Sequence, residues 1–255
     1  MNIIACIDHQ IGYRLAVQLI QLQKLGEITN LWLYTNPRPA EAFWDDCFYL
    51  KEVYTFENIF AFNNDQEIIK HTKNYVIDYI FLLSWKHLVS KELIEHSQKG
   101  CINLHYSLLP KFRGVYPVNW AIINGEKETG LTFHFVNQGI DAGDIILQRK
   151  LSISLTETAK CLLERLDDLA EQAFRELWDM IKSYQTLPRR PQTIVADYYS
   201  RKRFLQICQL SLTETVTGGE LLNLLRGTTF GAQSNLYFLD EKQQKVYITI
   251  QFHPE

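Results

Sequence analysis

Residues 101–114 read CINLHYSLLPKFRG, and this stretch decides how the rest of the chain is interpreted. The first five residues alternate like the end of a β-strand, so Asn103 and His105 project from one face of a sheet. Pro110 and Gly114 then interrupt regular structure and let the backbone approach a ligand closely. An amide beside an imidazole at the end of a buried strand is costly unless both are paired or used. The stretch therefore predicts a functional site.

A second segment supplies a carboxylate for such a site. Residues 139–144 read GIDAGD, which places Asp141 between two glycines just before the apolar run 145–147. A single Asn or His near a strand end is more often an ordinary turn residue than a catalyst. Asn, His and Asp together are suited to acyl transfer, as an oxyanion donor, a base, and a carboxylate that orients the imidazole.

These two segments resemble the folate-dependent formyltransferases, a superfamily of glycinamide ribonucleotide transformylases, methionyl-tRNA formyltransferases and nucleotide-sugar N-formyltransferases. The resemblance is carried by the Asn-Leu-His, Ser-Leu-Leu-Pro and Arg-Gly run and by the Gly-Ile-Asp-Ala-Gly-Asp-Ile segment. Asp141 follows Asn103 by 38 positions, as the family pattern requires. The resemblance covers roughly the first two-thirds of the chain, and it is closest to the nucleotide-sugar enzymes.

The fold that this resemblance implies is α/β, a Rossmann-like doubly wound and mostly parallel sheet with a small C-terminal α+β or β-hairpin subdomain. The sequence Pro-Arg-Arg-Pro at 188–191 interrupts a long helical pattern, so we expect a catalytic domain over 1–188 and a small subdomain over 189–255. We expect strands at 2–7, 28–35, 52–56, 75–83, 101–105, 129–136 and 145–153, and a hairpin over 235–250. We expect helices from 14 to 25, 65 to 73, 90 to 98 with Gly100 closing it, 116 to 124, 156 to about 184, and 220 to 225 with Arg226 at its end. Phe43, Trp44 and Phe48 are interpreted as core aromatics.

The resemblance also implies roles for particular residues. Asn103 would donate to the oxyanion, His105 would transfer the proton, and Asp141 would hold the imidazole. His134, flanked by phenylalanines in a strand pattern, is interpreted as a structural histidine. The co-substrate would be 10-formyltetrahydrofolate, held mainly by backbone groups of two loops: His87, Leu88 and Val89 in one, and Asn137, Gln138, Gly139, Ile140 and Asp141 in the other.

The acceptor implied by the resemblance is the amine of a nucleotide-linked amino-deoxy sugar used for surface glycans. A dTDP-linked 3- or 4-amino-dideoxy sugar is the first expectation, and a UDP-linked 4-amino sugar of the pseudaminic acid type is the second. The short tail and the Tyr-Tyr-Ser-Arg run at 198–201 favour this class. The residues expected to contact this substrate are Ser107, Arg113, Tyr116, Tyr199 and Arg201.

Composition excludes several other classes. The chain has 255 residues with Lys+Arg 26 and Asp+Glu 29, a net charge of −3, which disfavours a general nucleic-acid surface. Its five cysteines have no C-x-x-C spacing, so neither a disulfide framework nor a zinc site is indicated. The first strand-turn-helix has Gly12 alone in place of a dinucleotide fingerprint, so no nicotinamide or flavin is expected. No metal is expected, and the absence of a leader or membrane span predicts a soluble, cytoplasmic protein.

Several alternatives stay open at this point. The acceptor could be another amine, on methionyl-tRNA or glycinamide ribonucleotide. The chain could instead be a catalytically silent folate- or nucleotide-binding module, or could hydrolyse the formyl donor. A homodimer is expected, because the edge strands of the final hairpin would otherwise be exposed.

Overall fold

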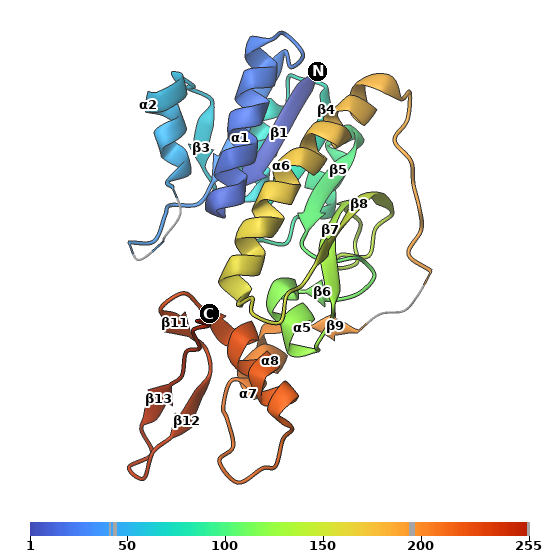
Figure 1. Cartoon of the computed structure of the whole chain (residues 1–255). Coiled ribbons are helices and arrows are strands. Elements are labelled where there is room, and N and C mark those ends of the chain that lie inside the picture. The colour runs from blue at the N-terminus through green and yellow to red at the C-terminus, as the bar shows by residue number, and fades with distance from the viewer. Residues whose placement is uncertain (41, 43–44, 194–196, 254–255) are drawn as a thin grey trace. The chain divides into compact units, whose positions relative to one another are not determined.

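The computed structural model describes residues 1–40, 42, 45–193 and 197–253 (Figure 1). The chain divides into two compact units that interleave along the sequence. The first unit comprises Met1–His105, Phe133–Leu147 and Ala170–Pro191, and the second comprises Tyr106–Thr132, Gln148–Leu169 and Gln192–Glu255. The functional boundary expected at residue 188 stays a prediction. Phe43 and Trp44 lie outside the described residues, whereas Phe48 lies half-buried in the short 3-10 helix Cys47–Tyr49.

A seven-stranded sheet with the order β3-β2-β1-β4-β5-β7-β8 forms the centre of the fold. The pairs β1–β2, β1–β4, β2–β3 and β4–β5 are all parallel, so the predicted mostly parallel α/β sheet is confirmed. The strands are β1 (Asn2–Ile7), β2 (Asn30–Thr35), β3 (Ile59–Ala61), β4 (Ile77–Leu83), β5 (Ser97–His105), β7 (Glu128–Phe135) and β8 (Ile145–Ser152). The strand order reverses between β1 and β4, and ligands of such sheets bind outside the carboxyl ends of strands at this switch point.

The two units also contain α-helices. They are α1 (His9–Lys24), α2 (Leu50–Tyr54), α3 (Asp65–Thr72), α4 (Lys91–Glu95), α5 (Pro117–Ile123), α6 (Ala159–Ser183), α7 (Arg201–Ile207) and α8 (Gly218–Thr228). The Asp8 carboxylate caps α1 by accepting a hydrogen bond from the backbone N–H of His9. Gly12 lets the first turn of α1 approach β4, because a Cβ there would lie 3.0 Å from the carbonyl oxygen of Leu83. Among the described residues, no helix is long and apolar enough to cross a membrane.

Three expectations about secondary structure in the first unit were wrong. The first helix, expected from residue 14, already begins at His9. Residues 52–56 do not form a strand; they overlap α2, in which Val53 is 63% exposed and Leu50 is the buried residue. The helix expected over 90–98 ends at Glu95, although Ser90 caps it as predicted through Leu93 N at 3.2 Å. Gly100 lies inside β5 with φ +132°, and a Cβ there would come within 2.7 Å of the Phe135 ring. Glycine is therefore required at position 100 because the Phe135 ring lies close to it, and not because a helix ends there.

The second unit is built around α5. Val118 and Ile122 of α5 pack with Leu162 and Leu166 of α6 in a buried cluster. The short strands here are β6 (Arg113–Gly114), β9 (Tyr198–Tyr199), β10 (Thr229–Phe230), β11 (Gln233–Ser234), β12 (Tyr237–Leu239) and β13 (Lys245–Tyr247). The predicted final hairpin is confirmed, since β12 and β13 pair antiparallel around a turn at Asp240.

The helix expected over 220–225 runs further, to Thr228, and Arg226 is buried inside it instead of marking its end. The guanidinium of Arg226 donates to the carbonyl of Ser154 at 2.7 Å and to the side chain of Asn223 at 3.0 Å. The next residue, Gly227, has no side chain, which lets α8 approach α5 closely: a Cβ at this position would come within 2.6 Å of Ile123 on α5. The C-terminal helix is thus fixed to the central helices of the second unit.

Candidate active site

Strand β5 positions two of the predicted catalytic side chains. Asn103 and His105 are two residues apart near its carboxyl end, so they project from the same side of the sheet. Asn103 is opposite Leu82 of β4 in the parallel register. His105 is 6% exposed and Asn103 is partly buried, so the imidazole and the amide lie in a largely dry environment.

The loop after β7 brings Asp141 to the same place. Asp141 adopts φ +48°, a left-handed conformation that Asp tolerates better than most residues. Gly143 allows the loop to return to the end of β7, because a Cβ there would overlap the carbonyl oxygen of Phe135. The backbone N–H of Phe135 donates to the carbonyl of Asp144 at 2.9 Å, which closes the loop. The GIDAGD segment therefore gives a tight return that points one carboxylate at β5.

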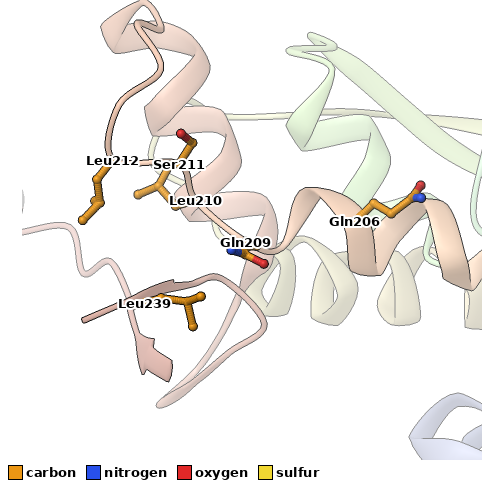
Figure 2. A pocket seen from close by; sticks show the side chains of 6 residues that line it. All are labelled: Gln206, Gln209, Leu210, Ser211, Leu212 and Leu239. Atoms are coloured by element: carbon orange, nitrogen blue, oxygen red, sulfur yellow. The ribbon is translucent and has the colours of Figure 1, made fainter. Parts of the chain in front are cut away.

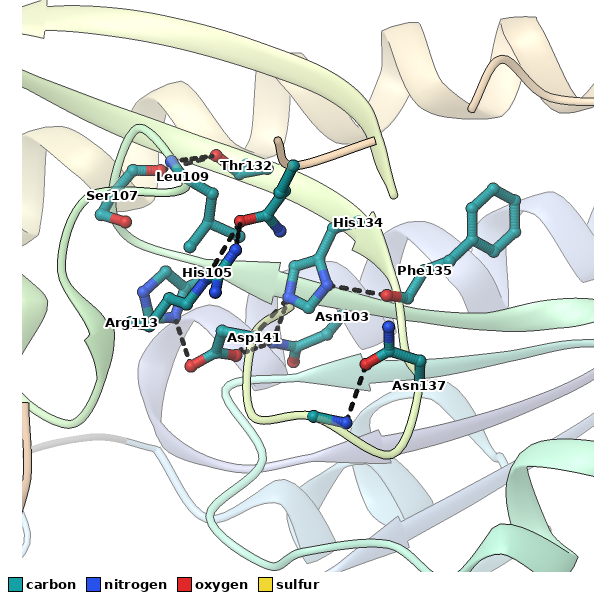
Figure 3. A network of polar contacts seen from close by, with 12 residues as sticks. Asn103, His105, Ser107, Leu109, Arg113, Thr132, His134, Phe135, Asn137 and Asp141 are labelled. Atoms are coloured by element: carbon teal, nitrogen blue, oxygen red, sulfur yellow. Dashed lines mark hydrogen bonds and ion pairs between the residues drawn. The ribbon is translucent and has the colours of Figure 1, made fainter. Parts of the chain in front are cut away.

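The three predicted catalytic side chains meet in the first unit (Figure 3). Asn103 Nδ2 donates to Asp141 Oδ1 at 3.3 Å, and Nδ1 of His105 lies 3.6 Å from Asp141 Oδ2. The side chains of His105 and Asp141 are only 7% and 14% exposed. One carboxylate thus contacts both the amide and the imidazole, each through a different oxygen, and it is largely shielded from solvent.

His134 is a fourth member of this cluster, and sequence reasoning missed it. Its Nε2 lies 3.1 Å from Asn103 Nδ2 and 3.5 Å from Asp141 Oδ1, and its ring is 2% exposed (Figure 3). Its Nδ1 lies 2.8 Å from the carbonyl oxygen of Phe135, so that nitrogen carries the proton. The signal was a histidine between two phenylalanines in a buried part of a strand, comparable to the amide of Asn103 near the end of β5.

The first loop expected to hold the folate lies between β4 and α4. Leu88 is 81% exposed, and His87 and Val89 are partly buried. Nε2 of His87 lies 2.8 Å from the side-chain oxygen of Asn36. Burial, and then the charge of Lys86, lower the pKa of His87 below its usual value, which favours the neutral ring. In the second loop, residues 137–140 are all exposed, and Asn137 Oδ1 accepts from Gly139 N at 2.9 Å.

The residues expected to contact the sugar nucleotide lie in the second unit. Ser107 is fully buried and donates to the carbonyl of Lys111 at 2.6 Å, so its side chain stabilises the turn; this burial does not favour a substrate contact, which stays a prediction. Arg113 donates to Gln192 Oε1 from Nε and Nη2, at 3.1 and 2.6 Å. Tyr116 is 38% exposed and precedes α5 with φ +59°.

Aromatic rings gather around Trp120 in the same unit. The ring centroids of Tyr199 and Trp120 lie 4.8 Å apart, and those of Phe204 and Tyr116 lie 4.5 Å apart. Arg201 is exposed at the start of α7, whereas the guanidinium of Arg203 lies 4.4 Å from the Tyr199 ring. The Tyr-Tyr-Ser-Arg run is therefore ordered as β9 and the start of α7, and Arg203 is the cation that stacks there.

A cavity of about 400 Å³ lies elsewhere in the second unit (Figure 2). It is open to solvent and borders α7 and β12. None of the predicted site residues lines it; the lining residues are Gln206, Gln209, Leu210, Ser211, Leu212 and Leu239. Across the part of the chain that the structure describes, no three His, Cys, Asp or Glu residues are placed to hold a metal ion.

A largely buried carboxylate shared by an amide and an imidazole is suited to acyl transfer. Comparison with known families agrees: the family model described as "Formyl transferase" matches residues 50–177, half of the chain. The chain belongs to the formyl transferase family. A second model, "N-formyltransferase dimerization C-terminal domain", matches residues 204–254.

The names of individual relatives and of solved structures with this fold differ in the acceptor that they state. The methionyl-tRNA formyltransferase of Alkaliphilus oremlandii is 34% identical over 167 residues, which cover 64% of this chain and 52% of the relative. The chain thus spans about half the length of the curated relatives it matches. A sugar N-formyltransferase structure from a Shewanella species covers 100% of this chain and 99% of its own, with a TM-score of 0.81 and 21% identity. An N-formyltransferase from Helicobacter canadensis, solved with folinic acid and dTDP-3-aminofucose, covers 95% and 85% with a TM-score of 0.71 and 19% identity. The two structural likenesses show a shared fold.

Proposed function

We propose that this chain transfers a formyl group from 10-formyltetrahydrofolate to the amine of a nucleotide-linked amino sugar. The observation that carries the formyl-transfer part is the meeting of Asn103, His105 and Asp141 in a member of the formyl transferase family. Family membership alone would also suit a silent binding module. The intact polar cluster favours catalysis, because a silent module gains nothing from shielding three polar side chains together.

The chemistry follows from the placement of these groups. The acceptor amine attacks the formyl carbon, a C–N bond forms, and the carbonyl oxygen becomes an oxyanion. Asn103 donates a hydrogen bond to that oxyanion, a contribution typically of about 3 kcal/mol to the barrier. His105 takes the proton from the amine and returns one to N10 of the folate as the old C–N bond breaks. Asp141, 3.6 Å from His105 Nδ1, orients the ring and stabilises its protonated form.

The formyl donor is assigned to the two loops at this edge of the sheet. The residues proposed to hold it are His87, Leu88 and Val89, with Asn137, Gln138, Gly139, Ile140 and Asp141. The large exposed fraction of Leu88 and of Ile140, at 81% and 41%, supports this assignment, because a flat heterocycle can bury both side chains. The Helicobacter canadensis protein of the same fold was solved with a folate compound.

An amino-sugar nucleotide is proposed as the acceptor on three grounds. The segment 204–254 matches an N-formyltransferase C-terminal domain, and two solved proteins of this fold are a sugar N-formyltransferase and one bound to dTDP-3-aminofucose. The rings of Tyr116 and Tyr199 offer partly exposed aromatic surface on which a base can stack. Arg113 and Arg201 are the cations proposed for the diphosphate, as dTDP first and UDP second.

Glycinamide ribonucleotide fits the first turn of the chain poorly. A phosphate would bind at the amino terminus of a helix such as α1, where backbone N–H groups are available. In this chain the buried carboxylate of Asp8, 4% exposed, already caps that terminus. The Asp8 carboxylate therefore already occupies the place that a phosphate would take. Methionyl-tRNA is disfavoured by the net charge of −3, since tRNA binding depends on cations along the contact surface.

The proposal includes a homodimer that works in the cytoplasm, in the synthesis of a surface glycan. The match of 204–254 to a dimerization domain supports the dimer, and so does Tyr247 on β13, which is 58% exposed. A strand with open hydrogen-bonding groups and an exposed aromatic favours pairing with a second copy. A monomeric mass in solution would remove this part of the proposal.

The test is a formyl-transfer assay with 10-formyltetrahydrofolate and a panel of acceptors. The panel contains dTDP-3-amino, dTDP-4-amino and UDP-4-amino sugars, methionyl-tRNA and glycinamide ribonucleotide. The native chain is compared with His105→Ala and Asp141→Asn, and with His71→Ala as a matched control, because His71 is exposed and contacts Tyr34 instead. We expect one sugar nucleotide to be formylated, with at least a 100-fold loss in the two site variants and none in the control.

Other outcomes redirect the proposal. Formylation of tRNA or glycinamide ribonucleotide alone would replace the acceptor and keep the chemistry. Formate release without any acceptor would indicate hydrolysis of the donor. Folate binding without turnover on any acceptor would favour the silent module.

A further inference from the structure

A buried carboxylate outside the catalytic cluster joins three loops at the carboxyl ends of β1, β2 and β4. Asp8 directly follows β1 and is 4% exposed. Its Oδ2 lies 3.2 Å from Nζ of Lys86 and accepts a hydrogen bond from Asn36 Nδ2 at 3.0 Å. Asn36 follows β2, and its side-chain oxygen lies 2.8 Å from Nε2 of His87. All four residues belong to the first unit.

This network fixes the orientation of each group in it. Because Nδ2 of Asn36 donates to Asp8, its oxygen faces His87 and must accept. Nε2 of His87 therefore carries a proton and donates. Lys86 balances the charge of Asp8, and burial together with Lys86 favours the neutral form of the His87 ring. A single tautomer of His87 results, and it is set by Asp8 through Asn36.

The backbone at both ends of these contacts is strained. Ser84, the first residue after β4, has φ +62°, and His9 has φ +58°. Their side chains meet, with Ser84 Oγ 3.1 Å from Nδ1 of His9. Left-handed non-glycine residues cost free energy and persist where the surroundings hold them, often at functional sites. Residues 84–87 are thus attached to the end of β1 by several contacts, at the switch point of the sheet.

We propose that Asp8 is a positioning residue for the formyl donor, holding the loop 84–89 through Lys86 and through the Asn36–His87 pair. This inference rests on the proposed function, because the loop carries His87, Leu88 and Val89. Asp8 itself touches neither the donor nor the reacting atoms. Its removal should weaken donor binding and leave acceptor binding and the chemical step unchanged.

The test compares Asp8→Asn with Asp78→Asn. Asn preserves the size of Asp8 and the α1 cap, because Asn is an equally good N-cap residue. Asp78 is a matched carboxylate on β4, paired with Lys99 at 2.8 Å at the opposite end of the strand. Binding of folinic acid is measured by calorimetry, and KM for each substrate is measured separately. We expect about a 10-fold weaker donor Kd for Asp8→Asn, with kcat and acceptor KM within twofold, and no change for Asp78→Asn.

A second variant and a spectroscopic readout keep the test independent of folding defects. Lys86→Met removes the exposed partner of Asp8 and should weaken donor binding in the same direction. Long-range ¹H–¹⁵N spectra should show the Nε2–H tautomer of His87 in the native chain and a tautomer mixture in Asp8→Asn.

Each contrary result has a defined meaning. If the native chain does not bind folinic acid, the proposed function is overturned and this inference with it. If the native chain binds and Asp8→Asn binds equally well, the inference alone is overturned. An equal rise in acceptor KM, or an unchanged His87 tautomer in Asp8→Asn, would also overturn it.

Discussion

The amide nitrogen of Asn103 lies 3.1 Å from Nε2 of His134, whose other ring nitrogen is committed to the carbonyl oxygen of Phe135 at 2.8 Å. Because Nδ1 of His134 carries the proton, Nε2 of the neutral ring is an acceptor for the amide N–H. The ring and the Asp141 carboxylate together leave the Asn103 amide one orientation, with its nitrogen toward them. Both N–H groups of the Asn103 amide are thus engaged in this structure. Donation to an oxyanion would use the N–H that now faces Asp141 at the longer distance of 3.3 Å, while the buried His134 on the neighbouring strand keeps the amide oriented.

Replacing His134 should therefore reduce turnover more than binding. We expect His134→Ala to lower kcat by about 10- to 100-fold, up to the cost of losing one oxyanion donor. KM for both substrates should stay within about threefold. The measurement is steady-state kinetics on the acceptor identified above.

His96→Ala is the matched control for this change. Nε2 of His96 contacts Thr72 Oγ1 at 2.8 Å, in the first unit but apart from the cluster of Asn103, His134 and Asp141. Its kcat should remain within twofold of the native value. A His134→Ala enzyme with normal kcat would show that Asn103 keeps its orientation without the ring.

Gly143 should tolerate no side chain. A methyl group there would overlap the carbonyl oxygen of Phe135, so the loop that carries Asp141 would have to move. We expect Gly143→Ala to lose activity and to lower the free energy of unfolding by about 2 kcal/mol or more. Gly218→Ala, at a position with nothing within 4 Å of the added Cβ, should leave both unchanged. Urea denaturation monitored by circular dichroism measures the difference; equal stability of the two variants would contradict the expectation.

One of the five cysteines should react with alkylating reagents much faster than the other four. Cys161 is exposed, whereas Cys6, Cys47, Cys101 and Cys208 are buried. Burial raises the pKa of Cys47 to about 12 and that of Cys208 to about 11, and it also raises the pKa of Cys6 and Cys101. At pH 8 these four thiols stay protonated and shielded from the reagent. Because the thiolate is the reactive form, they should react slowly. Iodoacetamide labelling with mass spectrometry should modify Cys161 first and all five only after denaturation.

Stability should fall on mild acidification, partly because of His96. Thr72 Oγ1 donates to the carbonyl of Ile68 at 2.8 Å, so Nε2 of His96 must donate to Thr72. Burial lowers the pKa of His96 below its usual value of about 6.5. The unfolded chain therefore takes up a proton first, so this contribution is complete above about pH 6.5 and is lost as the pH falls through the folded pKa.

His96→Gln tests this sign. The variant keeps a side-chain donor for Thr72 and has no titrating group. Its free energy of unfolding should decrease less between pH 7.5 and pH 5.5 than that of the native chain. A parallel decrease in both proteins would assign the pH dependence to other groups.

The sequence was a reliable guide where a periodic pattern was long and local. The apolar run at 75–83 predicted β4, and alternation at 101–105 placed Asn103 and His105 on one side of β5. The strand expected at residues 52–56 was wrong, because a short segment of mixed polar and apolar residues is compatible with both a strand and a helical turn. Val53 and Tyr54 are not buried there, so packing did not favour the strand.

The parts that sequence reasoning missed depend on strand order. His134 became a member of the cluster because β7 lies next to β5, and neither strand encodes that neighbour locally. The contacts of Asp8 with Lys86 and Asn36 likewise join the ends of β1, β4 and β2, which lie 28 or more positions apart. Such pairings arise from topology, which periodicity does not determine.

The buried guanidinium of Arg226 has a consequence for chimeric proteins. It is held by the carbonyl of Ser154, and the neighbouring Gly227 accepts from Asn119 Nδ2 at 2.8 Å. Both partners precede the C-terminal segment by about 70 to 110 positions. A recombination crossover placed between the two family matches would separate these partners and remove the contact of the buried guanidinium with residue 154. Exchange of the tail between relatives therefore requires that the turn at 154–157 and helix α5 be inherited together with it.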